Sequence, residues 1–164
     1  MPLARKWGWE LILPVAATGL LIIDQLTKLW VRTSLMPGQS IPGDGLPRLT
    51  YVQNAGSAFG LLTNQVFLIV VSVAVVAVAL FLYYRYRFFG SWLARVGLGL
   101  VLGGALGNLI DRIRFGWVTD FIDFVYWPVF NVADSAIVVG VIILVYILLR
   151  LAWVEGRTPR QGES

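Results

Sequence analysis

Four long apolar segments constrain what this chain can fold into. They cover residues 11–30, 65–84, 92–110 and 132–153. Each holds about 20 residues, the length at which a helix crosses the hydrocarbon core of a bilayer. Only 13% of the 164 residues are charged, whereas about a quarter are charged in a typical soluble domain. The sequence therefore predicts an all-α integral membrane protein with four transmembrane helices in a single domain over residues 1–164, ending in a polar tail at 155–164.

The composition excludes several kinds of catalytic site. The chain contains neither Cys nor His, which excludes a thiol nucleophile, a Ser-His-Asp triad and the usual zinc ligands. We expect no metal and no other cofactor. The formal net charge is +4, but the basic residues cluster beside the apolar segments, where they set membrane topology. We therefore expect contact with membrane lipid and no nucleic-acid partner.

The distribution of basic residues also predicts the orientation. More of them flank the two chain ends and the connection after residue 84 than flank the other two connections. Because cytoplasmic segments carry the excess of Lys and Arg, both termini are expected in the cytoplasm. The polar motifs would then all lie at the outer face of the membrane.

Carboxylates gather in one part of the chain. Asp111, Asp120, Asp123 and Asp134 are four of its nine acidic residues. Two neighbouring carboxylates share one proton, so one can act as a base while the other acts as an acid. Asp120 lies among apolar and aromatic residues, which favours its protonated form. Asp134 could pair with Asp120, Asp111 or Asp123, and the spacing alone does not choose among them.

Polar residues recur at the ends of the expected helices. Asp24 and Lys28 are four residues apart and share a helix face, which indicates a compensating ion pair or a support for a site. Asn108, Asp111 and Arg112 share a face at the end of the third segment. Because an unpaired carboxamide is costly in an apolar surrounding, Asn108 is expected to bind either a neighbouring helix or a substrate.

Asn131 and Asp134 are three residues apart at the start of the fourth segment. This spacing is typical of a capping box, in which Asn131 is the N-cap and Asp134 the third helical residue. Both could serve only to start the helix. Alternatively, the helix dipole stabilises the Asp134 anion, as a general base would require.

Three further patterns bear on the fold. Gly99, Gly103 and Gly107 recur every four residues, a spacing that lets another helix approach closely. Residues 49–53 alternate like a short strand, followed by a turn signal at residues 54–56. Residues 111–130 are amphipathic and rich in aromatic side chains, and we expect them to lie along the membrane surface or over the bundle.

Five short motifs occur in order along the chain. They are DQLTK at residues 24–28, NAGSAF at 54–59, GGALGNLIDR at 103–112, VTDF at 118–121 and FNVADS at 130–135. With the four apolar segments, they make residues 20–149 resemble the bacterial lipoprotein signal peptidases, also called signal peptidase II. The resemblance implies a membrane aspartyl endopeptidase that cuts diacylglyceryl-modified prolipoproteins just before the lipidated Cys. It also implies a monomer in the bacterial cytoplasmic (inner) membrane, with a β cradle and a surface helix, the latter before Asp120, on the outer side.

The same resemblance assigns roles to individual residues. It implies a catalytic dyad of Asp120 and Asp134, with Asp123 as a bystander. It implies structural support from Asp24, Lys28 and Asp111, with Asp111 as the partner of Arg112. The residues that it places around the substrate are Asn54, Gly56, Asn108, Arg112 and Asn131.

Two other classes of membrane protein are weaker interpretations. A proton- or cation-coupled transporter could use Asp24, Asp111 and Asp134 as relay sites, but it would favour ionisable groups near the midplane and matching sequence halves. Here the acids crowd one interface and no halves match. An assembly subunit would explain the glycines but not Asp120 and Asp134.

Overall fold

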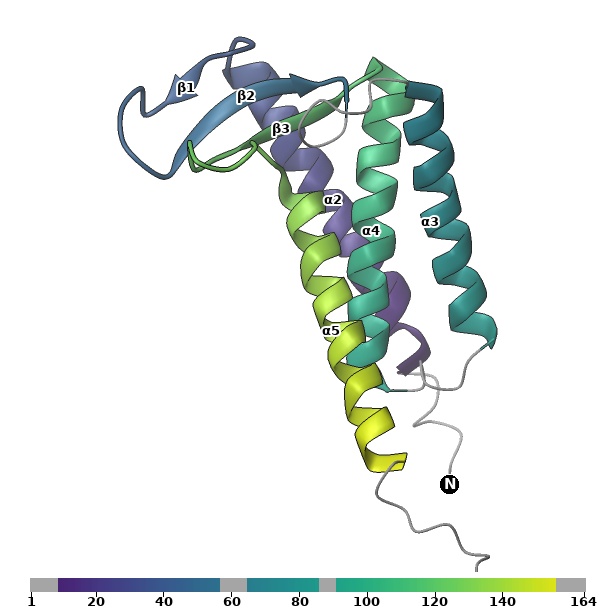
Figure 1. Cartoon of the computed structure of the whole chain (residues 1–164). Helices are drawn as coiled ribbons and strands as arrows, with labels where there is room; N and C mark the ends of the chain where they lie inside the picture. The colour runs from purple at the N-terminus through teal and green to yellow at the C-terminus, as the bar shows by residue number, and fades with distance from the viewer. Residues whose placement is uncertain (1–8, 57–64, 86–90, 156–164) are drawn as a thin grey trace, which may run out of the picture.

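A computed structural model describes residues 9–56, 65–85 and 91–155 of the chain. Its four long helices are α2 (Ile12–Ser34), α3 (Gln65–Arg85), α4 (Trp92–Phe115) and α5 (Val132–Glu155), shown in Figure 1. All four are long and apolar enough to cross a membrane, which confirms the expected all-α membrane architecture. The polar tail beyond residue 155 and motif residues 57–59 lie outside the described residues.

Two helices run about one turn past the ends that the sequence suggested. α2 continues to Ser34 and α4 to Phe115, whereas the apolar segments end at residues 30 and 110. The additional turns carry Arg32 and Asp111, whose side chains approach one another to 3.5 Å. Because the opposite charges of Arg32 and Asp111 compensate each other between the helices, both helices continue through these polar residues.

Helix α4 is the centre of the bundle and packs against α2, α3 and α5 (Figure 1). Its glycines make this close packing possible. A Cβ atom on Gly103 would lie 2.6 Å from the Ala17 carbonyl oxygen of α2. Gly99 and Gly107 also lie against α2, which confirms the close approach predicted from their spacing. Gly104 faces the opposite neighbour, because its Cβ would lie 2.5 Å from the Ala133 carbonyl oxygen of α5.

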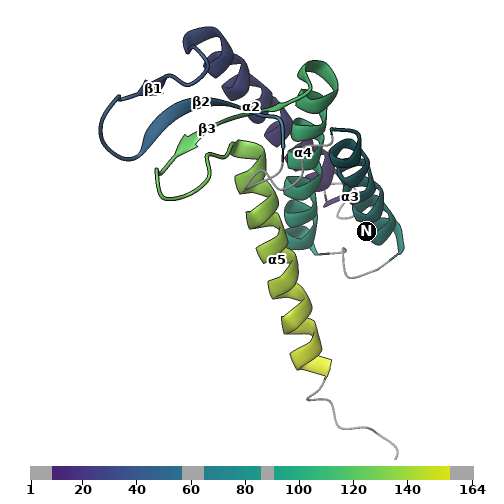
Figure 2. The same cartoon turned by 45° about the horizontal axis from the view of Figure 1, so that its top comes forward.

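A small antiparallel sheet projects from one end of the bundle (Figure 2). Its strands are β1 (Ser40–Ile41), β2 (Arg48–Asn54) and β3 (Val118–Asp123), in the order β1-β2-β3. β2 contains the strand expected at residues 49–53, and the sheet is the expected cradle. Because β3 lies between α4 and α5 in the chain, its pairing with β2 brings the first polar connection beside the start of α5.

The surface helix expected before Asp120 is not present in residues 91–155, which the structure describes without a gap. Instead, α4 continues to Phe115 and ends at Gly116, whose φ of 79° is the left-handed conformation of a helix C-cap. Residues 118–123 then form β3. The amphipathic pattern wrongly predicted a surface helix for two reasons. Asp111 is completely buried beside charged partners. Residues 118–123 pair as a strand with β2, which lies far away in sequence.

An apolar cluster holds the sheet on the bundle. Val31 and Leu35 at the end of α2 pack with Tyr51 of β2 and Phe121 of β3. All four side chains are at least 94% buried. Since neighbouring side chains of a strand point to opposite faces, burying Phe121 in this cluster leaves Asp120 directed to the other side.

Candidate active site

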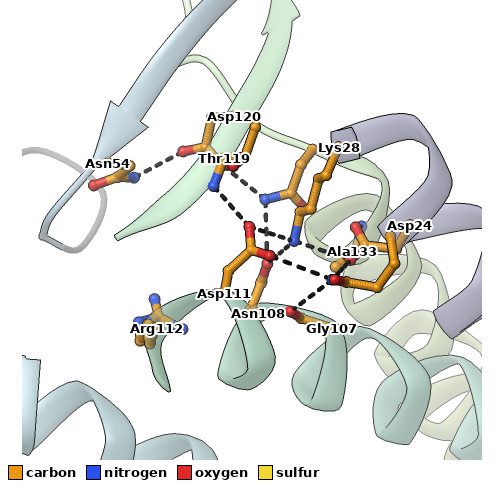
Figure 3. Close-up of polar contacts among 12 residues, drawn as sticks. Asp24, Lys28, Asn54, Gly107, Asn108, Asp111, Arg112, Thr119, Asp120 and Ala133 are labelled. Carbon is orange, nitrogen blue, oxygen red and sulfur yellow. Dashed lines mark hydrogen bonds and ion pairs between the residues drawn. The ribbon is translucent and has the colours of Figure 1, made fainter. Parts of the chain in front are cut away.

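Asp120 is a buried carboxylate at the middle of β3, with 2% of its surface exposed. Its Oδ2 accepts a hydrogen bond of 2.8 Å from Asn54 of β2, and its Oδ1 accepts one of 2.7 Å from Asn131 (Figure 3). Burial, reinforced by the negative charge of Asp134, raises the pKa of Asp120 to about 7. At neutral pH this carboxyl group is therefore poised to hold a proton or to release one.

Asp134 lies in the first turn of α5, where the chain forms the predicted capping box. Asn131 Oδ1 accepts a hydrogen bond of 2.9 Å from the backbone N–H of Asp134, and Asp134 Oδ2 accepts one of 3.3 Å from the backbone N–H of Asn131. The other carboxylate oxygen, Oδ1, accepts a hydrogen bond of 2.7 Å from Asn108 Nδ2. Both oxygens of Asp134 thus accept hydrogen bonds, one from Asn108 and one from the backbone of Asn131.

Asn131 joins the two carboxylates. Its side chain donates to Asp120 while its backbone N–H donates to Asp134, and the residue is completely buried. Of the three carboxylate pairs that the sequence left open, the geometry brings together Asp120 and Asp134. Two carboxyl groups of this kind can share a proton and activate a water molecule for attack on an amide.

Asp123 lies at the far end of β3 and belongs to the packing of the sheet. It accepts hydrogen bonds from Thr50 (2.6 Å), Arg48 (2.7 Å) and the backbone N–H of Val125 (2.7 Å). The hydrogen bonds from Thr50 and Arg48 hold its pKa below the ordinary value of an aspartate. The lowered pKa favours the anion of Asp123, whose hydrogen bonds come from β2 and from the residues directly after β3.

Lys28 is the centre of a buried polar network between α2 and α4 (Figure 3). Its ammonium group contacts Asp24 Oδ2 at 2.9 Å, Asn108 Oδ1 at 2.8 Å and Asp111 Oδ2 at 3.5 Å. The predicted pairing of Asp24 with Lys28 is confirmed. By fixing Asn108 Oδ1, Lys28 turns the Nδ2 donor of Asn108 toward Asp134, so the expected bond of Asn108 to a neighbouring helix is also present.

Arg112 is not the partner of Asp111, contrary to expectation. Asp111 approaches Lys28 and Arg32 of α2 and accepts a 2.9 Å hydrogen bond from the backbone N–H of Thr119. Arg112 points to another side of α4 and donates to Ser72 of α3 at 3.4 Å. Adjacent helix positions differ in direction by about 100°, so these two residues face different helices.

Asn54 and Gly56 form the turn predicted at the end of β2. Asn54 Oδ1 accepts a hydrogen bond of 3.0 Å from the backbone N–H of Gly56. This leaves the Nδ2 group of Asn54 as the donor to Asp120. The turn therefore fixes the orientation of the carboxamide that binds the buried carboxyl group.

Sequence reasoning missed Arg32 and Thr119 as parts of this region. Arg32 Nη1 donates a hydrogen bond of 3.0 Å to Thr119 Oγ1, and Thr119 directly precedes Asp120. One signal was available, because Arg32 continues the face of Asp24 and Lys28 by one more helical turn. In the described parts of the chain, no group of three or more His, Cys, Asp or Glu side chains could hold a metal ion.

Comparisons with known proteins identify the family of this chain. The family profile Peptidase_A8, signal peptidase (SPase) II, matches residues 16–150. A lipoprotein signal peptidase of Moorella thermoacetica is 52% identical over 145 residues, which cover 85% of this chain and 93% of the relative. A lipoprotein signal peptidase of Halothermothrix orenii is 46% identical over 130 residues, covering 78% of this chain and 88% of the relative.

Solved structures show the same architecture. A bacterial membrane enzyme determined at 2.3 Å superposes with a TM-score of 0.76 at 28% identity, covering 92% of each chain. A second one, determined at 1.9 Å, gives a TM-score of 0.72 at 30% identity over 82% of this chain and 90% of the other. The chain therefore belongs to the signal peptidase II family, an aspartic peptidase family.

Proposed function

We propose that this protein is the membrane endopeptidase that removes signal peptides from diacylglyceryl-modified prolipoproteins, cutting just before the lipidated Cys. The observation that carries the proposal is the junction of Asp120 and Asp134 through Asn131 at one end of a membrane bundle. A substrate tethered by acyl chains reaches such a site sideways from the lipid. The first residues after the cleavage point would then lie at the membrane surface.

The proposed mechanism uses Asp134 as the base and Asp120 as the acid. Asp134, whose oxygens face donors at a helix N-terminus, takes a proton from water as the water attacks the scissile carbonyl carbon. Asp120, with a pKa of about 7, supplies a proton when the tetrahedral intermediate expels the amine. The dyad as a whole keeps its proton count, because one proton enters at Asp134 and one leaves from Asp120.

The residues proposed to surround the substrate differ in how many hydrogen-bonding groups they have left for it. Asn108 and Asn131 use both ends of their carboxamides inside the network, so their main contribution is to orient the carboxylates. Arg112 donates to Ser72 at 3.4 Å, which leaves further guanidinium donors for carbonyl groups of the substrate. Asn54 and Gly56 border the dyad from the cradle side.

We further propose a monomer in the bacterial cytoplasmic membrane, with both chain ends in the cytoplasm and the dyad at the outer face. α2 begins and α5 ends at the same end of the bundle, opposite the sheet (Figure 1). The excess of basic residues near the chain ends favours the cytoplasm for that end. The dyad would then lie on the side where a translocated lipoprotein precursor emerges.

Cleavage of a diacylglyceryl-modified prolipoprotein by the purified protein in detergent tests the proposal. We expect Asp120→Asn and Asp134→Asn to abolish cleavage with EDTA present throughout, while Asp123→Asn, the matched control on the same strand, retains it. Cleavage by both dyad variants would contradict the assignment. Failure of the folded wild-type protein to cut would contradict the proposed activity itself.

A further inference from the structure

Helix α2 contacts the residue that precedes each dyad carboxylate. Asp24 Oδ1 accepts a hydrogen bond of 3.1 Å from the backbone N–H of Ala133, which precedes Asp134. Two turns further along α2, Arg32 donates a hydrogen bond of 3.0 Å to Thr119 Oγ1, which precedes Asp120. One rigid helix thus holds both segments that carry the dyad.

The charges between these two contacts alternate in sign. Asp24, Lys28 and Arg32 follow one another at intervals of four residues and so lie on one face of α2. Asp111 of α4 lies between the last two, 3.5 Å from Lys28 Nζ and 3.5 Å from Arg32 Nη1. The four formal charges sum to zero, so each buried charged group has a group of opposite charge beside it.

Arg32, the last of these charged residues along α2, has a side chain that is packed and mostly buried. Its guanidinium lies over the ring of Phe115, 4.6 Å from the ring centroid, and only 14% of its side chain is exposed. Its target, Thr119, is completely buried and is also bound through its backbone N–H by Asp111 at 2.9 Å. Both the side chain and the backbone of Thr119 are therefore anchored to the helices.

We propose that Arg32 is a positioning residue for the peptidase reaction. By anchoring Thr119 to α2, it fixes where β3 presents Asp120 relative to Asp134, which the same helix anchors through Asp24. Arg32 touches neither carboxylate of the dyad among the described contacts, so it acts through Thr119. This inference rests on the proposed function, because the spacing of two carboxyl groups matters only if both take part in one reaction.

The test compares kcat and KM of Arg32→Gln and Thr119→Val on the prolipoprotein substrate. Each change removes one end of the same hydrogen bond, so we expect each to lower kcat by about tenfold or more with little change in KM. The double variant should be no worse than either single one, and Thr119→Ser, which keeps the hydroxyl group, should retain wild-type kcat. Arg114→Gln is the matched control, since Arg114 also lies near the Phe115 ring, at 5.3 Å, and should leave kcat unchanged.

Additive losses, a loss confined to KM, or an equal loss in Arg114→Gln would overturn the proposal. Should Arg32→Gln fail to fold, Thr119→Val decides alone, because it leaves every charge in place. Deuterium uptake of residues 118–123 gives a readout that does not need cleavage. Uptake should be faster in Arg32→Gln and Thr119→Val than in Arg114→Gln, and equal uptake would refute the anchoring even if wild-type inactivity had already refuted the proposed function.

Discussion

Asn131 Nδ2 donates a hydrogen bond of 2.7 Å to Asp120 Oδ1. The same residue caps α5 through its other side-chain atom, Oδ1, which accepts the backbone N–H of Asp134 at 2.9 Å. A single carboxamide therefore performs two separable tasks, starting a helix and orienting a buried carboxyl group. Only the amide nitrogen of Asn131 orients Asp120. A side chain that can cap α5 but has no such nitrogen therefore separates capping from orientation.

Asn131→Ser should keep the cap and lose the donor to Asp120. Ser is about as good an N-cap as Asn, whereas Ala costs about 0.5–2 kcal/mol. We expect Asn131→Ser to unfold close to the wild-type temperature but to cut at least about tenfold more slowly, because Asp120 is no longer oriented. Asn131→Ala should lose both stability and activity. Thermal unfolding in detergent and initial cleavage rates check this, and wild-type rates in Asn131→Ser would contradict the positioning role.

The pH dependence of cleavage should report Asp120. Its pKa is about 7, so the protonated acid required by the mechanism is depleted as the pH rises through that value, and kcat/KM should fall there. The hydrogen bond from Asn54 lowers this pKa. Asn54→Ala should therefore move the falling limb to higher pH.

A control for the Asn54 variant lies next to it on β2. Gln53 is exposed and donates to the Tyr51 hydroxyl group at 3.1 Å, so Gln53→Ala should leave the limb in place. A limb that moves to lower pH in Asn54→Ala, or equally in both variants, would be inconsistent with Asp120 as the acid.

Asp123 should matter for stability and not for catalysis. At neutral pH its anion accepts hydrogen bonds from Thr50 and Arg48, and losing hydrogen bonds to a charged group costs about 1.5–3 kcal/mol. Asp123→Asn should therefore unfold at a lower temperature while keeping its cleavage rate. Because the folded pKa of Asp123 lies below its ordinary value, the stabilisation is present above the unfolded pKa and is lost as the pH falls through the folded pKa.

The pH series of unfolding temperatures checks the sign of this effect. The difference between wild type and Asp123→Asn should be largest near neutral pH and should shrink as the solution is acidified below about pH 4. A difference that grows on acidification would show that the carboxylate is not stabilised by Thr50 and Arg48.

Local sequence patterns predicted the helices and the capping box but not the contacts between distant segments. The sequence predicts the four helices and the cap formed by Asn131 and Asp134, because each of these features depends on residues close together in the chain. The strand β3 was not readable, since its pairing edge lies some 70 residues earlier, as in the register of Val52 with Asp120. The true partners of Asp111 were missed for the same reason, because they lie on α2, about 80 residues away.

A side chain at Gly104 should disturb both the helix packing and the position of Asp134. A Cβ atom there would lie 2.5 Å from the Ala133 carbonyl oxygen and 2.8 Å from Ile137 Cγ1, so α5 must move at the turn that carries Asp134. Overpacking of this kind costs about 1–3 kcal/mol. Gly104→Ala should therefore lower both the unfolding temperature and kcat. Gly19→Ala on α2 is the matched control, because no atom lies within 4 Å of a Cβ atom built there and Ala favours a helix over Gly by about 1 kcal/mol. If both variants lost unfolding temperature and kcat to a similar extent, the contact of Gly104 with α5 would not be responsible.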